Sequence, residues 1–369
     1  MATQLVSKPR ENELPDLTSI QTKKKAPERE YWLYFLTASA CVTVVWGHVA
    51  AQVFLNASTP FQWWVGNITD SAARWCVTLF IMVSGYLLLN PSKEYTIMEF
   101  YKKRASRIII PFVFWALFFA VVNTLRHVFN GDPVSFSSFI KPVLNGHPNY
   151  HLWYLYMLVG LYVLTPFLRA GLKKIPPRWL PGICAALFII PAAVNTYSWF
   201  ALKADFISDY PFIVWPLYLL GYYLAGYLIG KKAKIETKTI TLVTAFLAST
   251  AVTAFGCYIL KENISDFAGI YFYSPAALNV VFTTLVFFML GKKLAANIRN
   301  NKILETGNAV SFGIYLIHPF WIFTLDYFGF GATKMNPIIG IIIVGLAVFI
   351  LSLATTLLIQ KIPHLRKVV

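Results

Sequence analysis

Residues 338–360 read IIGIIIVGLAVFILSLATTLLIQ, an apolar run without a single charged side chain. At a rise of about 1.5 Å per residue, a helix of this length crosses the roughly 30 Å hydrocarbon layer of a bilayer. Other apolar stretches of similar length precede it, separated by short polar connections. The sequence therefore predicts an all-α, polytopic membrane helix bundle of about ten transmembrane helices. We expect the spans near residues 31–53, 72–90, 108–126, 150–168, 180–200, 210–230, 239–260, 271–291, 308–328 and 338–360.

The composition agrees with a membrane protein. Hydrophobic residues make up 57% of the 369 residues and charged residues only 13%, against about 25% charged in a typical soluble domain. Aromatic residues reach 17%, which suits lipid-facing surfaces and the interfacial belts of Trp and Tyr. The net charge of +16 could indicate a nucleic-acid partner, but the cations are spread over many connections rather than gathered on one face. We therefore expect no nucleic-acid binding.

The positions of Lys and Arg predict the orientation. Of the 32 cations, 26 fall on the side of the N-terminal tail and five on the other side, while Arg74 stands at the entrance of the second span. This alternation follows the positive-inside rule, so both termini are expected in the cytoplasm. Residues 1–30 are polar and carry Lys23, Lys24 and Lys25 without the apolar core of a signal peptide. We expect a disordered basic tail there, a membrane domain over 31–360 and a short basic cytoplasmic tail over 361–369.

The four cysteines give no sign of a metal site or a disulfide framework. They all lie in apolar stretches, with no CxxC or Cys/His ligand spacing, so small buried thiols are expected and no metal. They are Cys41, Cys76, Cys184 and Cys257.

Ionisable groups within the spans are few. A charge at the centre of a bilayer costs about 2.5–3.5 kcal/mol or more, so such groups often mark a functional site. His48 lies in the outer half of the first span, where a titratable imidazole suits a general base. His318 could equally be neutral and bonded to a carbonyl of another helix, and Arg74 and His151 could reach the interface with their polar ends.

A basic cluster leads into the third span and allows two interpretations. Lys102, Lys103, Arg104 and Arg107 could serve only to orient the helix in the membrane. They could also hold a phosphorylated cytosolic donor, since guanidinium groups bind phosphates through paired hydrogen bonds.

Taken together, these residues resemble the acyltransferase 3 family of bacterial membrane O-acyltransferases, ten-helix proteins that acetylate or succinylate surface glycans. The resemblance covers about residues 31 to 325. Its carriers are Tyr31-Trp32 with Ala40-Cys41 and His48; Arg74 with Leu79-Phe80-Ile81-Met82-Val83-Ser84-Gly85-Tyr86; Lys103-Arg104-Ala105-Ser106-Arg107 before Pro111; His151-Leu152-Trp153-Tyr154; and Ser311-Phe312-Gly313-Ile314-Tyr315-Leu316-Ile317-His318-Pro319.

The resemblance implies transfer of an acyl group from cytosolic acyl-CoA, either acetyl-CoA or succinyl-CoA, to a hydroxyl of a cell-surface or exported polysaccharide. It implies His48 as base or acyl relay, Arg74 as a substrate or oxyanion group, and a bacterial cytoplasmic (inner) membrane location. The cationic cluster would hold the CoA phosphates and the other motif residues would bind substrate. The expected CoA-binding residues are Lys103, Arg104 and Arg107, and the expected substrate-binding residues are His151, Trp153, Tyr154, His318, Ser84 and Tyr86.

Two positions depart from the family pattern. Members of the family normally have Arg or Lys eleven residues before the histidine, and this position is Thr37 here. They usually have an acidic residue three positions before that Arg or Lys, and this position is Tyr34 here. Eleven residues return to nearly the same helix face, about 16 Å further along the axis. Either another cation substitutes, with Arg107 or Lys103 as the candidates, or the activity of this chain has changed.

The departure leaves a second class of function open. A catalytically altered chain could carry a glycan or lipid-linked sugar, or act as a partner subunit of a polysaccharide synthase or export complex. An ion-coupled carrier is disfavoured because the carboxylates Asp209 and Asp326 lie only near span ends. The expected partners are membrane lipid and a glycan acceptor, with a synthase, an export complex or a separate periplasmic transferase as the protein partner.

Overall fold

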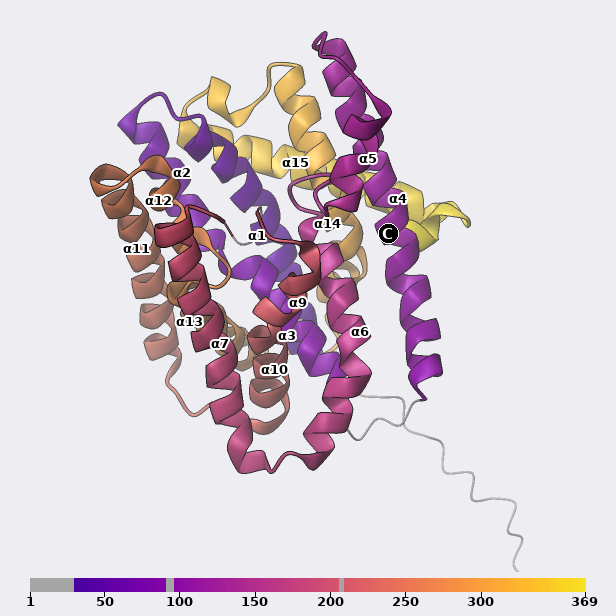
Figure 1. The fold of residues 1–369 in the computed structure, drawn as a ribbon, viewed down its shortest axis with the longest axis vertical. Coiled ribbons are helices and arrows are strands. Elements are labelled where there is room, and N and C mark those ends of the chain that lie inside the picture. The colour runs from indigo at the N-terminus through magenta and orange to yellow at the C-terminus, as the bar shows by residue number, and fades with distance from the viewer. Residues whose placement is uncertain (1–29, 91–95, 206–208) are drawn as a thin grey trace, which may run out of the picture. The chain divides into compact units, whose positions relative to one another are not determined.

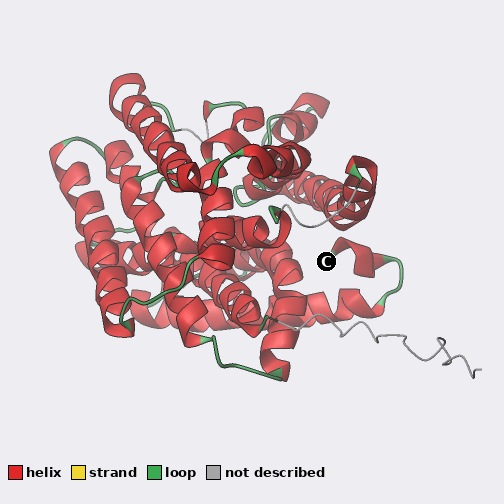
Figure 2. Cartoon of the chain, turned by 90° about the horizontal axis from the view of Figure 1, so that it is seen from below, coloured by secondary structure: helices red, strands yellow, loops and turns green. Residues whose placement is uncertain are grey.

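The computed structural model describes residues 30–90, 96–205 and 209–369. The predicted N-terminal tail lies almost wholly outside these residues. Residues 31–369 form one compact unit, and its described part is built from helices joined by loops, without a strand (Figure 2). Within this part, ten helical segments are long and apolar enough to cross a membrane. The prediction of an all-α bundle of about ten spans is confirmed.

Five of the ten spans consist mainly of one uninterrupted helix. They are α1 (Tyr31–Leu55), α4 (Ile97–Phe129), α6 (Trp153–Lys174), α11 (Thr239–Asn263) and α15 (Pro337–Lys361).

The remaining spans combine several helical pieces. They are α2 (Pro60–Ala73) with α3 (Trp75–Leu88); Pro177–Trp179 with α7 (Leu180–Tyr197) and the π-turn Ser198–Leu202; Phe212–Val214 with α9 (Trp215–Tyr218) and α10 (Leu220–Tyr227); α12 (Asp266–Gly269) with η6 (Tyr271–Tyr273) and α13 (Leu278–Leu294); and α14 (Lys302–Tyr327) with Ala332–Lys334. Outside the spans lie α5 (Phe136–Leu144) and η8 (Leu365–Val368).

The second span begins earlier than predicted. Hydropathy suggested a start near residue 72, whereas the helix begins at Pro60, with Thr59 capping its first turn through the amide of Gln62. The polar residues that lowered the hydropathy face inward and find partners there. Asn67, for example, is fully buried and donates to the carbonyl of Ala254 at 2.9 Å. A buried polar residue with such a partner does not end a membrane helix.

The first helix occupies the centre of the bundle. It packs against α2, α3, α13, α14 and α15, and the residues between Leu36 and Val53 that face these helices are almost completely buried. In Figure 1, α4 and α5 lie on one side of the unit, and α11 lies on the opposite side. The central helix therefore presents its side chains to most of the interior, including the positions of Thr37 and His48.

Two glycines allow α3 and α10 to approach closely. A Cβ atom on Gly85 would lie 1.8 Å from the carbonyl oxygen of Tyr223, and one on Gly226 would lie 1.9 Å from the carbonyl oxygen of Met82. Small residues let membrane helices pack backbone against backbone. This crossing fixes the position of α3, which carries residues of both pockets described below.

The C-terminal residues fold back onto the bundle. Trp115 on α4 is almost fully buried and donates its indole N–H to the carbonyl of Val368 at 2.7 Å. The turn η8 packs against α4 and α15. The C-terminal segment is therefore anchored to α4, while its position relative to the cytoplasm stays a prediction.

Candidate active site

Two adjoining pockets lie among the helices around α1. We call the first the histidine pocket; it has a volume of about 320 Å³ and includes His48, Asp70, Arg74 and His151 in its lining. We call the second the arginine pocket; it has a volume of about 210 Å³ and is lined by Thr37, Phe80, Ser84, Arg104, Arg107, Ile108, Tyr154, Leu158, Tyr162, Ser311, Phe312 and Tyr315. The two pockets gather residues from distant parts of the chain.

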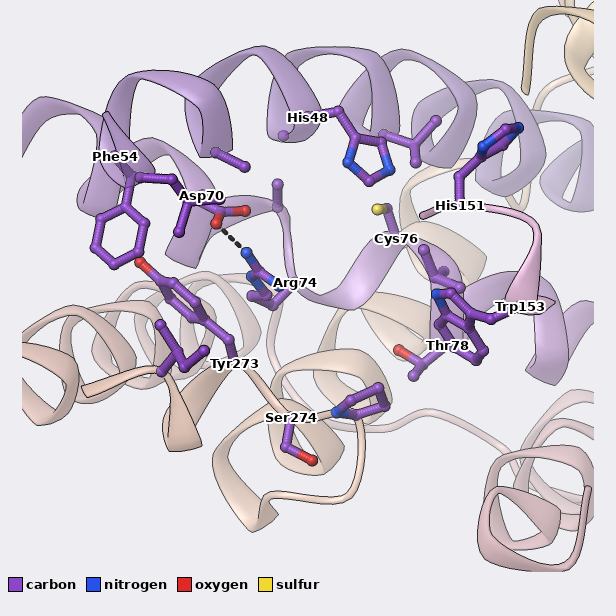
Figure 3. Close-up of a pocket in the computed structure, with 18 of the residues that line it drawn as sticks. His48, Phe54, Asp70, Arg74, Cys76, Thr78, His151, Trp153, Tyr273 and Ser274 are labelled. Carbon is purple, nitrogen blue, oxygen red and sulfur yellow. Dashed lines mark hydrogen bonds and ion pairs between the residues drawn. The ribbon is translucent and has the colours of Figure 1, made fainter. Parts of the chain in front are cut away.

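His48 extends from the central helix into the histidine pocket (Figure 3). Its ring stacks on the ring of His318, with centroids 5.2 Å apart and planes 22° from parallel, and meets Tyr150 edge-on at 4.8 Å. The side chain is half-buried, and neither ring nitrogen is hydrogen-bonded to another described residue. The aromatic contacts orient the imidazole and leave its nitrogens available to a substrate.

His318 lies behind His48, outside the lining of the pocket. It is completely buried, and its Nδ1–H donates to the carbonyls of Tyr315 at 2.7 Å and Ile314 at 3.3 Å. Since carbonyls only accept, these bonds place the proton of the neutral ring on Nδ1. Its Nε2 has no hydrogen-bond partner among the described residues. His318 therefore supports His48 through ring contact rather than by reaching the cavity.

His151 lies in the loop before α6 and reaches the same pocket (Figure 3). Its Nε2 lies 3.3 Å from the carbonyl oxygen of Leu316, and its Nδ1 lies 3.0 Å from Asn149 Oδ1. Both oxygens are acceptors, so the single N–H of a neutral ring donates to one of them. Burial lowers the pKa of His151 well below its usual value, and the nearby imidazoles of His318 and His48 lower that pKa further. The ring is therefore neutral and is held by one hydrogen bond, as expected of a residue that shapes the pocket.

Arg74 stands at the interruption between α2 and α3. Its guanidinium forms an ion pair with the carboxylate of Asp70, which is 4% exposed (Figure 3). The guanidinium also lies 3.9 Å from the ring centroid of Tyr273, whose hydroxyl donates to Asn67 Oδ1 at 2.5 Å. The Nε atom of Arg74 is buried without a hydrogen-bond partner among the described residues. The side chain as a whole is 28% exposed, so another part of this fixed cation can reach a ligand oxygen.

Aromatic side chains form part of the wall of the histidine pocket. Trp153, Trp199, Phe54 and Tyr273 all line it. Flat aromatic faces beside polar groups suit the apolar faces and hydroxyls of a sugar ring. Of these residues, Trp153 belongs to a motif that resembles the family.

The arginine pocket combines cations with hydroxyl groups. Arg104 and Arg107 come from α4, and Ser84, Tyr154 and Tyr162 add hydroxyl groups from α3 and α6. The Nε atom of Arg104 is buried without a hydrogen-bond partner among the described residues. Guanidinium groups with free donors bind phosphate oxygens well, so the lining suits an anionic ligand.

Thr37 also lines the arginine pocket. Its hydroxyl donates to the carbonyl of Leu33 at 2.8 Å within the same helix, so this position supplies no charge to the pocket. The cations near Thr37 come instead from Arg104 and Arg107 on α4. The helix that carries the positive charge of the pocket is thus α4 rather than α1.

Besides His318, Tyr86 and Lys103 lie outside both pockets. The hydroxyl of Tyr86 accepts a hydrogen bond from Lys231 Nζ at 2.8 Å, and its ring meets Trp32 edge-on at 4.9 Å. Lys103 is exposed on α4 and is not part of the lining of the arginine pocket. Tyr86 therefore packs against neighbouring helices near the end of α10, away from both cavities.

Sequence reasoning missed several residues that the structure brings to the site. Asp70 falls between the predicted first and second spans, although its spacing of four residues before Arg74 is that of a helical ion pair. Trp199 and Tyr162 carry no local signal, because only the folding of distant segments brings them to the pockets.

The part of the chain that the structure describes contains no group of three or more His, Cys, Asp or Glu side chains placed to hold a metal ion. The four cysteines are buried free thiols.

Comparison with known proteins identifies the family. The family described as an acyltransferase domain, Acyl_transf_3, matches residues 30–357, nearly the whole described chain. The chain therefore belongs to the acyltransferase 3 family and is a multi-pass membrane protein.

A curated relative supports the same assignment. The chain is 22% identical over 299 residues to YfiQ of Bacillus subtilis (strain 168), which is described as a candidate membrane-bound acyltransferase. The match covers 79% of this chain and 80% of that protein. No solved structure matches the chain significantly.

Proposed function

We propose that this protein moves an acetyl or succinyl group from cytosolic acyl-CoA to a hydroxyl of a cell-surface or exported polysaccharide, in the bacterial cytoplasmic membrane. The observation that carries the proposal is that a cationic pocket and a histidine-containing pocket adjoin, with Tyr315 lining both. Such a pair of pockets suits a reaction in which donor and acceptor approach from opposite sides of the membrane.

The arginine pocket is the donor side in this proposal. Arg104 and Arg107 hold phosphate groups of CoA, because their forked donors match phosphate oxygens. Arg104 is partly exposed and Arg107 is exposed, and both line the pocket, which supports this contact. The pocket has a volume of about 210 Å³ and accommodates only part of the donor. Arg107 is exposed, so the rest of CoA would extend past it into the cytosol.

The histidine pocket is the acceptor side. His48 accepts the proton of the sugar hydroxyl while the hydroxyl oxygen attacks the thioester carbonyl carbon. Arg74 donates a hydrogen bond to the oxyanion that forms on the carbonyl oxygen. The carbon–sulfur bond then breaks, and the CoA sulfur takes the proton from His48, so that an ester and free CoA leave. A positioned general base typically contributes about 10²–10⁴-fold to the rate of such a step.

The aromatic wall supports a glycan as the acceptor. Trp153 would stack on a sugar ring, and polar atoms of Asp70 and Ser274 lie in the same lining. The protein partner would supply the acceptor or receive the product; it would be a polysaccharide synthase, an export complex or a separate periplasmic transferase. Membrane lipid surrounds the spans.

A variant of His48 tests the proposal. In the purified protein, His48→Gln should lower acyl transfer from labelled acetyl-CoA or succinyl-CoA to an extracted surface polysaccharide by about 10²-fold or more. His127→Gln is a matched control, because that exposed histidine pairs with Asp132 outside both pockets and should leave transfer unchanged. Transfer that survives His48→Gln at a normal protein level would contradict the enzymatic role of His48. Absence of acyl-CoA binding by the unmodified protein would refute the proposed donor.

A further inference from the structure

Tyr315 occupies the boundary between the two pockets. It is the one residue that lines both of them within the described part of the chain. Its side chain is 4% exposed. The side chain therefore fills the space where a path from one pocket to the other would pass.

The helices around Tyr315 show that the pockets lie one after the other. On α1 the lining changes from Thr37 in the arginine pocket to Val44 and His48 in the histidine pocket. On α3 it changes from Ser84 and Phe80 to Thr78, and at the start of α6 from Tyr154 to Trp153. The same order on three helices defines a single axis through both cavities.

A hydrogen bond and several rings hold Tyr315 in place. Its hydroxyl donates to the main-chain carbonyl of His151 at 2.5 Å. Its ring meets Tyr154 at a centroid distance of 5.5 Å and His151 at 5.4 Å, both edge-on. The bond ties α14 to the loop before α6, so the ring cannot turn away without losing a buried hydrogen bond.

We propose that Tyr315 separates the donor and acceptor pockets and so determines whether the acyl group passes to a glycan hydroxyl or to water. This inference rests on the proposed function. His48 can remove a proton from water as readily as from a sugar, because both are weak hydroxyl nucleophiles. While the thioester waits in the arginine pocket, the closed partition keeps the water of the histidine pocket away from it. Transfer to a glycan bound beside His48 requires the Tyr315 ring to move aside.

The competing reaction is hydrolysis of the donor. The oxygen of water attacks the thioester carbonyl carbon, the carbon–sulfur bond breaks, and the proton taken from water reaches the CoA sulfur. The products are free CoA and the carboxylic acid. A closed partition suppresses this reaction, whereas an opened one favours it.

The first test measures access to the arginine pocket and needs no activity. Ser84→Cys is introduced into a chain whose four native cysteines are replaced by alanine, in vesicles of known orientation. A membrane-impermeant maleimide is then added on the side opposite the Lys- and Arg-rich connections. With Tyr315 present, Ser84→Cys should react slowly. Adding Tyr315→Phe should speed labelling up to about tenfold, the factor that one lost buried hydrogen bond contributes to an opening equilibrium. Tyr315→Ala should speed it further.

The second test measures the fate of the acyl group in the purified protein. Tyr315→Phe should raise the ratio of acyl-CoA hydrolysis to glycan acylation by several-fold to about tenfold. Tyr156→Phe is the matched control, because Tyr156 also donates to a main-chain carbonyl, that of Val143 at 2.7 Å, but lines neither pocket. That ratio should not change in the control.

The outcomes separate this inference from the proposed function. Equal labelling of Ser84→Cys with and without Tyr315 would overturn the partition, even if acyl transfer is normal. An unchanged ratio of hydrolysis to transfer in both Tyr315 variants would overturn its role in selecting the acceptor. Failure of the unmodified protein to turn over acyl-CoA would refute the proposed function, while the labelling test would still report on the partition.

Discussion

The carboxylate of Asp70 pairs with the guanidinium of Arg74 across the interruption between α2 and α3. The two side chains are one helical turn apart, and both line the histidine pocket. The pair fixes the direction of the guanidinium, while Arg74 Nε stays unpartnered among the described residues. Asp70 thus acts on any ligand through the position of Arg74.

We expect Asp70→Asn to impair catalysis more than donor binding. The amide keeps the size of the carboxylate but lacks its charge. The Arg74 guanidinium would then no longer be held in the orientation that donates to the oxyanion. Loss of one oxyanion donor costs about 10²–10³ in kcat, and a misplaced donor should cost about tenfold or more. Steady-state kinetics should show a lower kcat with little change in the KM for acyl-CoA.

Asp132→Asn is the control for this prediction. Asp132 pairs with His127 at 2.9 Å on an exposed part of the chain and lines neither the histidine nor the arginine pocket. Its loss should leave kcat unchanged. An equal fall in kcat for both variants, or a change confined to KM in Asp70→Asn, would contradict a positioning role for Asp70.

We expect the double variant Arg104→Gln with Arg107→Gln to weaken acyl-CoA binding. Charge-assisted hydrogen bonds contribute about 1.5–3 kcal/mol each, so the KM for acyl-CoA should rise by at least about tenfold. Lys102→Gln, on the exposed face of the same helix, should change it little. Comparison of CoA with dephospho-CoA in a binding assay would show which phosphate the arginines contact. Unchanged affinity in the double variant would place the donor elsewhere.

We expect Thr37→Arg to strengthen donor binding. Thr37 already lines the arginine pocket, and an arginine there would add a third guanidinium facing the same space. The KM for acyl-CoA should fall several-fold if one further charge-assisted bond forms. A substitution of Thr43, which lies on α1 but lines neither pocket, by arginine serves as the control. A rise in KM specific to Thr37→Arg would mean that the pocket has no room for a third cation.

We expect Gly85→Ala and Gly226→Ala to destabilise the bundle. The added methyl group would overlap a main-chain carbonyl of the opposing helix, and overpacking of this kind costs about 1–3 kcal/mol. The melting temperature in detergent should fall for both variants. Gly171→Ala is the control, because nothing lies within 4 Å of the added atom and alanine favours a helix. Equal melting temperatures for Gly85→Ala and Gly171→Ala would contradict the close crossing of α3 and α10.

Much of the fold follows from the sequence because membrane burial depends on length and hydropathy. The ten spans and most of their limits were predicted from apolar runs alone. The resemblance implied that His48 and Arg74 act at one site, and both line the histidine pocket. The start of the second span was not predicted correctly by hydropathy. Hydropathy counts Asn67 and Asp70 as polar, but the structure satisfies them inside the bundle.

The arrangement of the site depends on packing that a sequence does not reveal. Tyr86 and Tyr315 both belong to motifs that resemble the family, yet Tyr86 packs against Trp32 and Lys231 while Tyr315 lines both pockets. Which face of a helix meets a cavity is set by its neighbours. The roles assigned to the residues of both pockets stay predictions that the experiments above can decide.

The central helix sets a fixed length within the site. Thr37 and His48 lie on one uninterrupted α-helix, eleven residues apart, and each lines a different pocket. At about 1.5 Å per residue, their separation along the axis is about 16 Å. Under the proposed function, a compact donor such as an acyl phosphate held at the level of Thr37 would not reach His48. A donor that carries its acyl group on a long flexible arm would, so the length of α1 between the two residues would select donors by their reach.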